Sequence, residues 1–264
     1  MKRLDISAPV LSQQDLGHGI LLLAILAPEI AKAALPGQFC MLHAGSPETT
    51  DPLLRRPFSI HYADGDTIFF LYRVVGKGTR LIAAMRPGDV IRILGPLGCG
   101  FSISAETKNI LVGGGLGTAP LFFLARSLPR EGTTIMLGAK TSGELARADA
   151  FLPHAEKVFL STDDGSLGQH GLVTELLAGH IQRTLCTGFL PLVSACGPWP
   201  MVRAVAHLCH INGIPCQVSL EARMACGTGL CLGCAIPRSG GGYLHVCTDG
   251  PVLDAALVDW ETSQ

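Results

Sequence analysis

Four cysteines near the carboxyl end constrain this chain more than any other feature. Cys226, Cys231 and Cys234 follow the spacing C-x4-C-x2-C, and twelve residues separate the third cysteine from Cys247. This is the spacing of plant-type [2Fe–2S] proteins, in which four thiolates converge on two irons. Glycines alternate with these cysteines, and glycine lets a backbone curl tightly through positive φ. The sequence therefore predicts that the four cysteines ligate a [2Fe–2S] cluster.

Two other uses of these cysteines stay open at this point. A structural zinc site usually combines C-x2-C with a second short pair, whereas Cys247 stands alone. Disulfides belong to oxidising compartments, and no apolar signal core follows the basic residues of the amino terminus. The longest early apolar run, at 20–27, is far shorter than the roughly 20 residues that span a bilayer. We therefore expect a cytoplasmic protein with no membrane partner.

The composition suits a soluble chain with more than one core. The 264 residues are 48% hydrophobic and 16% charged, and the formal net charge is -1. A chain of this length can form two domains and a smaller third. There is no basic tract, so we expect no nucleic-acid partner. Six further cysteines stand mostly in apolar contexts and are expected to be buried free thiols: Cys40, Cys99, Cys186, Cys196, Cys209 and Cys216.

Apolar periodicity divides the chain into three parts. Residues 1–101 contain short strand-like runs separated by turn signals, which predicts an antiparallel β barrel. Residues 102–220 alternate strand-like and helical segments, which predicts an α/β domain with a parallel sheet. Residues 221–264 are rich in glycine and cysteine and predict a small cluster domain with one hairpin. The barrel strands are expected at 19–26, 38–43, 58–62, 67–74 and 89–94.

Three motifs in the first part suit a flavin nucleotide. Arg-Arg-Pro-Phe-Ser-Ile at 55–60 begins a strand-like run, Leu-Tyr-Arg at 71–73 ends another, and Gly-Lys-Gly-Thr at 76–79 opens a helical turn. Arginine and the free N–H groups at a helix start both bind phosphate. The hydroxyl of Ser59 can hydrogen-bond flavin N5, the atom that exchanges hydride. Each motif alone also fits an ordinary turn, but together they predict a flavin site.

Two turns in the second part suit a dinucleotide. Gly-Gly-Gly-Leu-Gly-Thr at 113–118 follows a strand-like run and begins a helix, although it departs from the standard glycine fingerprint. Cys-Gly-Pro at 196–198 ends a later strand, where an ordinary turn with a buried thiol fits equally well. Asp163 and Asp164 end another strand, as ribose ligands or as a solvated turn. Nucleotide contacts are expected at Gly113, Gly114, Gly115, Gly117, Thr118, Cys196, Gly197 and Pro198.

The preference between the two nicotinamide cofactors follows from the charges at this edge. A 2′-phosphate requires arginine-type partners, whereas a free 2′-hydroxyl prefers an acid. Asp163 and Asp164 would repel a phosphate, and Lys140 is the cation that can oppose this effect. The sequence therefore predicts NAD rather than NADP.

The order of these motifs resembles the ferredoxin–NADP reductase superfamily. The segment Leu-Glu-Ala-Arg-Met-Ala-Cys-Gly-Thr-Gly-Leu-Cys-Leu-Gly-Cys at 220–234, with Cys-Thr-Asp-Gly-Pro at 247–251, resembles one branch of it. That branch is the electron-transfer subunits of B-type, NAD-dependent dihydroorotate dehydrogenases. Ala225 departs from the glycine expected in many relatives, which is a small change.

The resemblance implies an oxidoreductase subunit of pyrimidine biosynthesis. It would carry FAD and a [2Fe–2S] cluster and reduce NAD with electrons from a partner subunit that holds FMN and oxidises dihydroorotate, two copies of each chain forming a heterotetramer. Subunits of ferredoxin:NADP oxidoreductases and sulfide dehydrogenases share this layout, and an inactive metal-bound scaffold is a further alternative. No catalytic acid or base is implied. The implied FAD contacts are Arg56, Pro57, Phe58, Ser59, Leu71, Tyr72, Arg73, Gly78 and Thr79.

Overall fold

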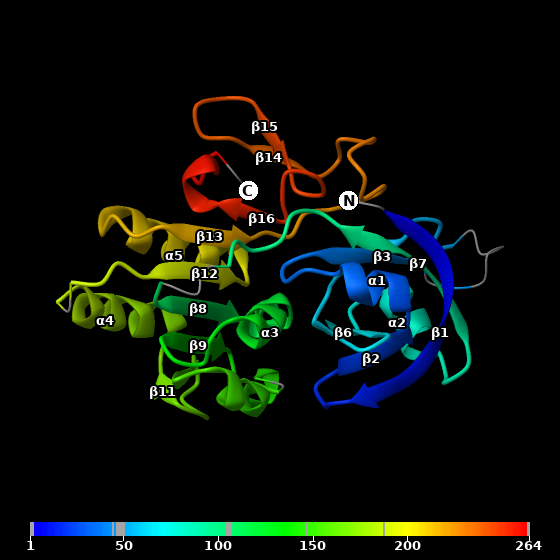
Figure 1. The fold of residues 1–264 in the computed structure, drawn as a ribbon, viewed down its shortest axis with the longest axis horizontal. Helices are drawn as coiled ribbons and strands as arrows, with labels where there is room; N and C mark the ends of the chain where they lie inside the picture. The colour runs from blue at the N-terminus through cyan, green and yellow to red at the C-terminus, as the bar shows by residue number, and fades with distance from the viewer. Residues whose placement is uncertain are drawn as a thin grey trace.

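The chain folds into three connected parts. The structure is a computed structural model, and it describes residues 3–43, 45, 51–103, 107–145, 147–186 and 188–262. The ends of the predicted first and third domains, residues 1–2 and 263–264, lie outside these ranges. Figure 1 shows an antiparallel part in blue and cyan on the right, a parallel sheet in green and yellow on the left, and the orange and red carboxyl-terminal segment above them.

The first part is a strongly curled antiparallel sheet of seven strands in the order β4-β3-β7-β1-β2-β6-β5. The edge strands β4 and β5 are joined only by Ile60 and His61, so the sheet curls until its two edges are close. Apolar side chains such as Leu23, Ile68 and Phe70 fill the interior. This confirms the predicted barrel. The strands are β1 Leu4–Asp15, β2 Ile20–Leu26, β3 Phe39–His43, β4 Arg56–Ser59, β5 Tyr62–Asp64, β6 Thr67–Arg73 and β7 Val90–Leu97.

The barrel differs from the sequence expectation in its details. The central strand β1 was not expected, because it is rich in polar residues and contains Pro9, which disfavours a strand assignment. A bulge between Val10 and Ser12 accommodates the irregularity. The single strand expected at 58–62 is two strands that break at Ile60 and His61. Two short helices, α1 Pro28–Ala33 and α2 Lys77–Ala83, follow β2 and β6.

The second part is a sheet in the order β11-β10-β9-β8-β12-β13-β16. All its pairs are parallel except the last, in which β16 runs antiparallel to β13. Helices α4 and α5 share one apolar core, while α3 contributes Leu121 and Leu124 to a different one, so the two faces are covered separately. The elements are β8 Asn109–Gly114, α3 Thr118–Ser127, β9 Thr133–Ala139, β10 Lys157–Thr162, β11 Gln169–His170, α4 Val173–Leu185, β12 Leu192–Cys196, α5 Trp199–Ile211 and β13 Cys216–Ser219.

The third part carries the four cysteines and packs against both sheets. A hairpin pairs β14 Ala235–Pro237 with β15 Tyr243–His245, close to the expected position. Strand β16 Val252–Asp254 then joins the second sheet beside β13. Four short 3-10 turns complete the fold: η1 Gly115–Gly117, η2 Ser142–Glu144, η3 Ala148–His154 and η4 Ala255–Leu257. The third part therefore shares a sheet with the second part. The domain boundaries at 101 and 220 stay predictions.

Two features bear on the remaining expectations. Cys40, Cys196, Cys209 and Cys216 are buried free thiols, but Cys99 and Cys186 are exposed, so burial was wrongly expected for these two. Cys99 follows β7 in a glycine-flanked turn, and Cys186 is the C-cap of α4. Within the described ranges, every helix is too short or too polar to cross a membrane.

Candidate flavin, nucleotide and cluster sites

The cysteine loop is arranged as a curl around Cys226. The N–H groups of Thr228 and Cys231 both donate to Cys226 Sγ at 3.4 Å. Burial opposes ionisation of this thiol, but the two N–H donors outweigh it and lower the pKa of Cys226 to about 6. The loop therefore presents a sulfur that is prepared to act as a thiolate ligand.

The other end of the curl is held by two buried cysteines. Cys234 and Cys247 are each 2% exposed, and the Cys247 N–H donates to Cys234 Sγ at 3.4 Å. Burial and the adjacent Cys234 thiol raise the pKa of Cys247 to about 12. The raised pKa keeps the Cys247 thiol protonated unless a metal displaces the proton, which is the usual coupling of thiol ionisation to metal binding. The four cysteines thus fit an iron–sulfur group, with N–H groups already directed at two of the sulfurs.

The glycines of the loop permit close contact with the barrel. Gly227 has φ +71°, and a Cβ atom there would lie 2.7 Å from Met41 Cγ on β3. Gly229 has φ +87°, and its Cβ would lie 2.9 Å from Thr248 Cγ2. In the barrel, Met41 pairs in register with Pro57 of β4. The cluster loop therefore rests on the strand next to the predicted flavin strand.

The predicted phosphate ligands of the flavin site come together. A Cβ atom on Gly78 would lie 3.0 Å from Arg56 Nε, so this guanidinium lies directly against the start of α2. Thr79 is used differently from the expectation, because its Oγ1 accepts the N–H groups of Val75 and Gly76 at 2.9 and 3.0 Å. The Thr79 hydroxyl thus stabilises the turn that begins α2. The Arg56 side chain lies against this turn at Gly78.

Two of the predicted flavin residues, Phe58 and Tyr72, face the barrel interior, whereas Leu71 packs on the other side of β6 against Ala119 of α3. Phe58, Leu71 and Tyr72 are 7%, 6% and 4% exposed, and the Phe58 and Tyr72 rings pack edge to face at 5.3 Å. The Tyr72 hydroxyl donates to Gln13 Oε1 at 3.0 Å. Any contact that these residues make with a flavin would therefore come from their backbone. Their side chains hold the two strands in place.

A small cavity joins the flavin strand to the segment that precedes the cluster loop. It has a volume of about 150 Å³, and its lining includes Pro57 and Ser59 from β4 together with Glu221 and Met224. Burial raises the pKa of the Glu221 carboxyl, although this residue also reaches solvent. Burial first, and then the Glu221 charge, raise the pKa of Cys196 to about 12. Ser59 and Glu221 thus line one cavity from two distant segments of the chain.

Glu221 is a site residue that sequence reasoning did not single out. It stands two residues after the end of β13 and within the segment that resembled the cluster-loop branch, but its type alone carries no spacing signal. An acidic residue just beyond a buried strand is the hint that the sequence contains.

The nucleotide-binding turns lie side by side at the carboxyl edge of the second sheet. Gly113 pairs with Cys196 in register, and a Cβ atom on Gly117 would lie 2.3 Å from the Cys196 carbonyl oxygen. A Cβ on Gly197 would similarly lie 3.0 Å from the Gly114 nitrogen. The absence of side chains at these glycines leaves two backbone turns in close contact at the place where open α/β sheets bind ligands. The helix α3 begins there, at Thr118.

Asp163 and Asp164, the acids predicted near the ribose, lie in the loop after β10. Hydrogen bonds connect this loop to the loop after β9. Asp164 Oδ1 accepts from the Ser166 N–H at 3.0 Å and from the Ser166 Oγ at 2.6 Å. The Ser166 Oγ in turn accepts the Ser142 N–H at 2.8 Å. Hydrogen bonds from Ser166 lower the pKa of Asp164, so this side chain is an anion that orders the loop. Asp163 and Lys140 lie on the same two loops.

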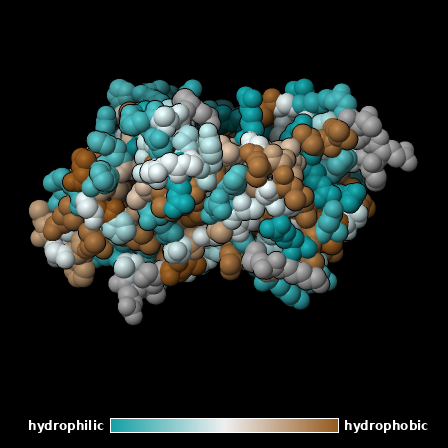
Figure 2. Space-filling model, turned by 90° about the horizontal axis from the view of Figure 1, so that it is seen from above, coloured by the Kyte–Doolittle hydropathy of each residue, from teal (hydrophilic) through white to brown (hydrophobic). Residues whose placement is uncertain are grey.

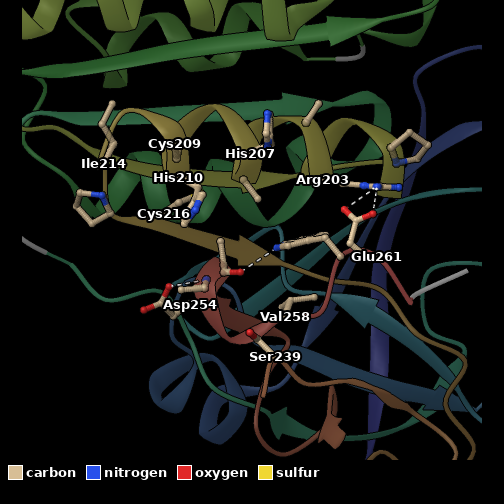
Figure 3. Close-up of a pocket in the computed structure, with 18 of the residues that line it drawn as sticks. Arg203, His207, Cys209, His210, Ile214, Cys216, Ser239, Asp254, Val258 and Glu261 are labelled. Carbon is tan, nitrogen blue, oxygen red and sulfur yellow. Dashed lines mark hydrogen bonds and ion pairs between the residues drawn. The ribbon is translucent and has the colours of Figure 1, made fainter. Parts of the chain in front are cut away.

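A larger cavity lies away from all of these residues. It has a volume of about 1050 Å³ and is bounded by α5, by the start of β13 and by the carboxyl-terminal segment (Figure 3). Arg203 crosses its rim to form a bidentate ion pair with Glu261, at 2.9 and 3.0 Å. None of the predicted flavin, nucleotide or cluster residues is among the described residues that line it.

A family model and several solved structures match this chain. A family model described as the iron–sulfur cluster binding domain of dihydroorotate dehydrogenase B matches residues 221–259. The solved structure of an NADH-dependent reduced ferredoxin-NADP oxidoreductase matches with a TM-score of 0.83 and 27% identity, over 96% of this chain and 90% of that one. A ferredoxin NADP+ reductase from Neisseria gonorrhoeae, with bound FAD and NADP, shares the fold at a TM-score of 0.62 and 20% identity, over 79% of this chain and 92% of that one.

The barrel, the parallel sheet and the cysteine loop define an iron–sulfur reductase of the ferredoxin–NADP reductase fold. The electron transfer subunit of dihydroorotate dehydrogenase B (NAD(+)) from Desulforamulus reducens is 39% identical over 89% of this chain and 90% of its own length. The subunit of the same description from Geobacillus thermodenitrificans is 38% identical, over 94% and 96%. The chain belongs to this family of electron transfer subunits, which confirms the resemblance found in its motifs.

Proposed function

We propose that this chain passes electrons from a dihydroorotate-oxidising partner subunit that holds FMN to NAD+, through a [2Fe–2S] cluster and FAD. The contact of Gly227 with Met41, which pairs in register with Pro57, is the observation that carries the proposal. Neighbouring strands lie about 5 Å apart. The cysteine loop and the strand of Ser59 are therefore separated by one strand, which is a short path for an electron.

The spacing of the thiols favours a two-iron cluster over a structural zinc ion. A structural zinc site usually pairs C-x2-C with a second short pair, whereas Cys247 stands alone. A structural zinc site needs four ligands around one metal. Two irons share four cysteines, so each iron needs only two of them.

The protein contributes position and electrostatics to this relay. When bound, the cluster supplies one-electron transfer, and FAD converts between single electrons and a hydride. Arg56 lies beside the start of α2, where it can bind the flavin phosphates. The adjacent backbone turns at Gly113–Gly117 and Cys196–Pro198 would bind the nicotinamide nucleotide. Ser59 and Glu221 line the cavity beside which the hydride donor and acceptor would meet. No residue is required as a general base.

An apolar surface around the cluster loop suits a partner subunit. Leu230 and Leu232 flank Cys231 and are 86% and 57% exposed. The view onto the carboxyl-terminal side shows apolar groups interspersed with polar ones (Figure 2). A partner that docks here would bring its own redox group close to Cys231. As the family resemblance implies, we propose two copies of each chain in a cytoplasmic complex.

The first test of this function is the spectrum of the purified protein, handled without oxygen. We expect FAD and two irons per chain, a visible absorbance from both groups, and an EPR signal of a reduced [2Fe–2S] cluster after addition of dithionite. Zinc in place of iron, or a colourless protein after reconstitution with iron and sulfide, would contradict the proposal. A colourless scaffold would then be the better description.

The choice of nicotinamide is a separate prediction. Asp164 is ordered as an anion by Ser166, and Asp163 follows the same strand, so a 2′-phosphate at this edge would meet negative charge. We expect kcat/KM for dye reduction to be higher with NADH than with NADPH, since the 2′-phosphate would meet like charge at this edge. The measurement uses one fixed ionic strength. A ratio at or below one would reject NAD and favour a ferredoxin:NADP oxidoreductase.

A further inference from the structure

The barrel and the nucleotide-binding part meet at an interface that lies beside both predicted cofactor sites. A small apolar cluster joins Ile20, Leu22 and Leu71 of the barrel to Ala119 of α3. His61 is fully buried, and its ring hydrogen-bonds the Ala119 carbonyl oxygen at 2.9 Å. These contacts hold the two parts together from the side of α3. A second set of contacts, from the loop that follows β9, is polar.

One ion pair crosses this boundary. Arg73 Nη1 donates to Glu144 Oε1 at 3.0 Å, and the two side chains are only 30% and 24% exposed. Arg73 ends β6 within one of the predicted flavin motifs, whereas Glu144 ends η2 in the loop that follows the nucleotide-binding edge of β9. The pair therefore connects a flavin residue with the loop on the nicotinamide side. Its partial burial makes it more than an ordinary surface pair.

The Arg73 side chain is only partly satisfied within this chain. Its Nε is buried and has no hydrogen-bond partner among the described residues. A buried charged donor without a partner is costly, and such groups in native proteins usually face a ligand or a water. The carboxylate of Glu144 fixes one end of the guanidinium through Nη1, so the Nε–H is left for another acceptor. A nucleotide phosphate is an acceptor that suits an arginine fork.

The loop that carries Glu144 is held against the barrel by its neighbour. Gly143 packs on the ring of His18, which stands at the tip of the β1–β2 turn, and a Cβ atom at Gly143 would lie 2.3 Å from that ring. The lack of a side chain at Gly143 leaves room for this contact with the exposed His18 ring. On its other side the loop is tied to the turn after β10 by the Ser142 N–H to Ser166 Oγ hydrogen bond, at 2.8 Å. Glu144 is therefore presented to Arg73 from a loop that is fixed at both sides.

We propose that Glu144 is a positioning residue for the flavin site: it holds the Arg73 guanidinium across the boundary so that the free Nε–H binds a phosphate of the flavin nucleotide. The inference rests on the proposed binding of FAD in the barrel. It gives the nicotinamide-side loop a direct influence on how tightly the flavin is held. Loss of the carboxylate should release Arg73 from its orientation without removing any group that contacts the cofactor.

The test is the rate at which FAD leaves the purified holoprotein after dilution, followed by the rise in fluorescence of free FAD. Glu144→Gln should release FAD about tenfold faster, which corresponds to roughly 1.4 kcal/mol. Glu144→Asp, which keeps the charge on a shorter side chain, should lie between Glu144→Gln and wild type. Glu131→Gln is the matched control, because Glu131 is exposed in the turn at the opposite edge of the sheet. Cluster absorbance and the melting temperature report whether each variant is folded.

A double-mutant cycle separates positioning of Arg73 from general stabilisation of the interface. Arg73→Gln alone should release FAD quickly, and adding Glu144→Gln to it should change the rate by less than about twofold. Release at the wild-type rate in Glu144→Gln, or an equal acceleration with and without Arg73, would overturn the inference. A wild-type protein that binds no FAD would instead reject the proposed function, and the inference with it.

Discussion

Individual hydrogen bonds from backbone N–H groups to cysteine sulfurs stabilise the cysteine loop. Thr228 and Cys231 direct their N–H groups at Cys226 Sγ, and Cys247 directs its own at Cys234 Sγ, each at 3.4 Å. These donors point at two of the four sulfurs, and such N–H groups stabilise thiolate ligands. The least buried member of the set is Cys231, which is exposed between Leu230 and Leu232.

The first prediction at this scale concerns Cys231. Removal of one of four thiolate ligands should prevent assembly of the cluster, while the flavin site in the barrel is left intact. Cys231→Ala is therefore expected to lose the iron and the EPR signal of the reduced cluster and to keep one FAD per chain. Cys186→Ala is the control, because Cys186 is also an exposed free cysteine but caps α4. An unchanged iron content in Cys231→Ala would remove this residue from the ligand set.

The second prediction concerns the acid sensitivity of the fold through His61. Burial lowers the pKa of His61 to about 3, with only partial compensation from its hydrogen bond to Ala119. In the unfolded chain a histidine titrates near about 6.5, so between these two values unfolding takes up a proton. The free energy of unfolding should therefore fall as the pH drops below about 6.5, by up to about 1.4 kcal/mol per pH unit from this residue.

His61→Phe tests this contribution, because phenylalanine keeps the stacking on Phe122, whose ring lies 4.7 Å away. The variant loses a hydrogen bond and should be less stable at pH 7 by about 1 kcal/mol. Its stability, measured by urea unfolding between pH 7 and about 4, should nevertheless fall less steeply than that of the wild type. Equal slopes for the two proteins would show that His61 is not the neutral, buried group described above.

Residue type and spacing predicted some residues of the candidate cluster and flavin sites, but not the contacts that each side chain makes. The cysteine spacing and the Arg-Pro-Phe-Ser motif identified Cys226 and Ser59. Glu221 escaped notice because its position beside Ser59 depends on distant segments meeting at one cavity, which no local pattern encodes. Thr79 was expected at a phosphate, but in the structure its hydroxyl receives two N–H groups of its own turn. A threonine that caps a helix and one that binds a ligand look the same in a sequence.

At the scale of elements, the nucleotide site depends on two strand-to-helix turns that touch. The turn after β8 and the turn after β12 are adjacent because their strands are paired, with Gly113 opposite Cys196. Gly117 has ordinary helical φ, so its lack of a side chain is needed for space rather than for conformation. Its neighbour is a backbone carbonyl, which cannot rotate out of the way.

Gly117→Ala should therefore damage the nicotinamide site selectively. The added methyl would lie 2.3 Å from the Cys196 carbonyl oxygen, so one of the two turns must move. Overpacking of this kind costs about 1–3 kcal/mol, and we expect NADH to bind at least about tenfold more weakly. Titration of the holoprotein with NADH measures this, with FAD and iron contents expected to stay at wild-type values. Gly179→Ala, in the middle of α4, is the control, and NADH affinity equal to the control's would refute the argument.

Long periodic elements were predictable and short or irregular ones were not. Helical segments were expected within 102–220, and α4 shows why, because buried positions such as Leu177 and Ile181 recur at helical spacing. Strand β16 was missed because three residues are too few to show a period, and its partner β13 lies far away in sequence. Strand β1 was missed because Pro9 and a bulge break its alternation. Tertiary pairing decides both of these strands.

At the scale of the whole molecule, the carboxyl-terminal segment joins the two larger parts. One apolar core contains Met41 and Leu97 of the barrel, Val205 of α5, and both Cys234 and Cys247. The Cys99 N–H also donates to the Gly250 carbonyl oxygen at 2.6 Å, next to the end of β7. The cluster loop is thus fixed to the barrel and to the second sheet at once. The order of three parts was predictable from the sequence, but their packing around one core was not, because it depends on contacts between distant residues.

This packing leads to the central claim, that electrons from dihydroorotate reach NAD+ through the cysteine loop. The direct measurement uses the complex of this chain with its FMN-containing catalytic subunit, supplied with dihydroorotate and NAD+ in the absence of oxygen. NADH and orotate should form in equal amounts, and the complex that carries Cys231→Ala should form no NADH although it retains FAD. NADH formation at the wild-type rate without the cluster would contradict the account, and so would an intact complex that oxidises dihydroorotate and leaves NAD+ unreduced.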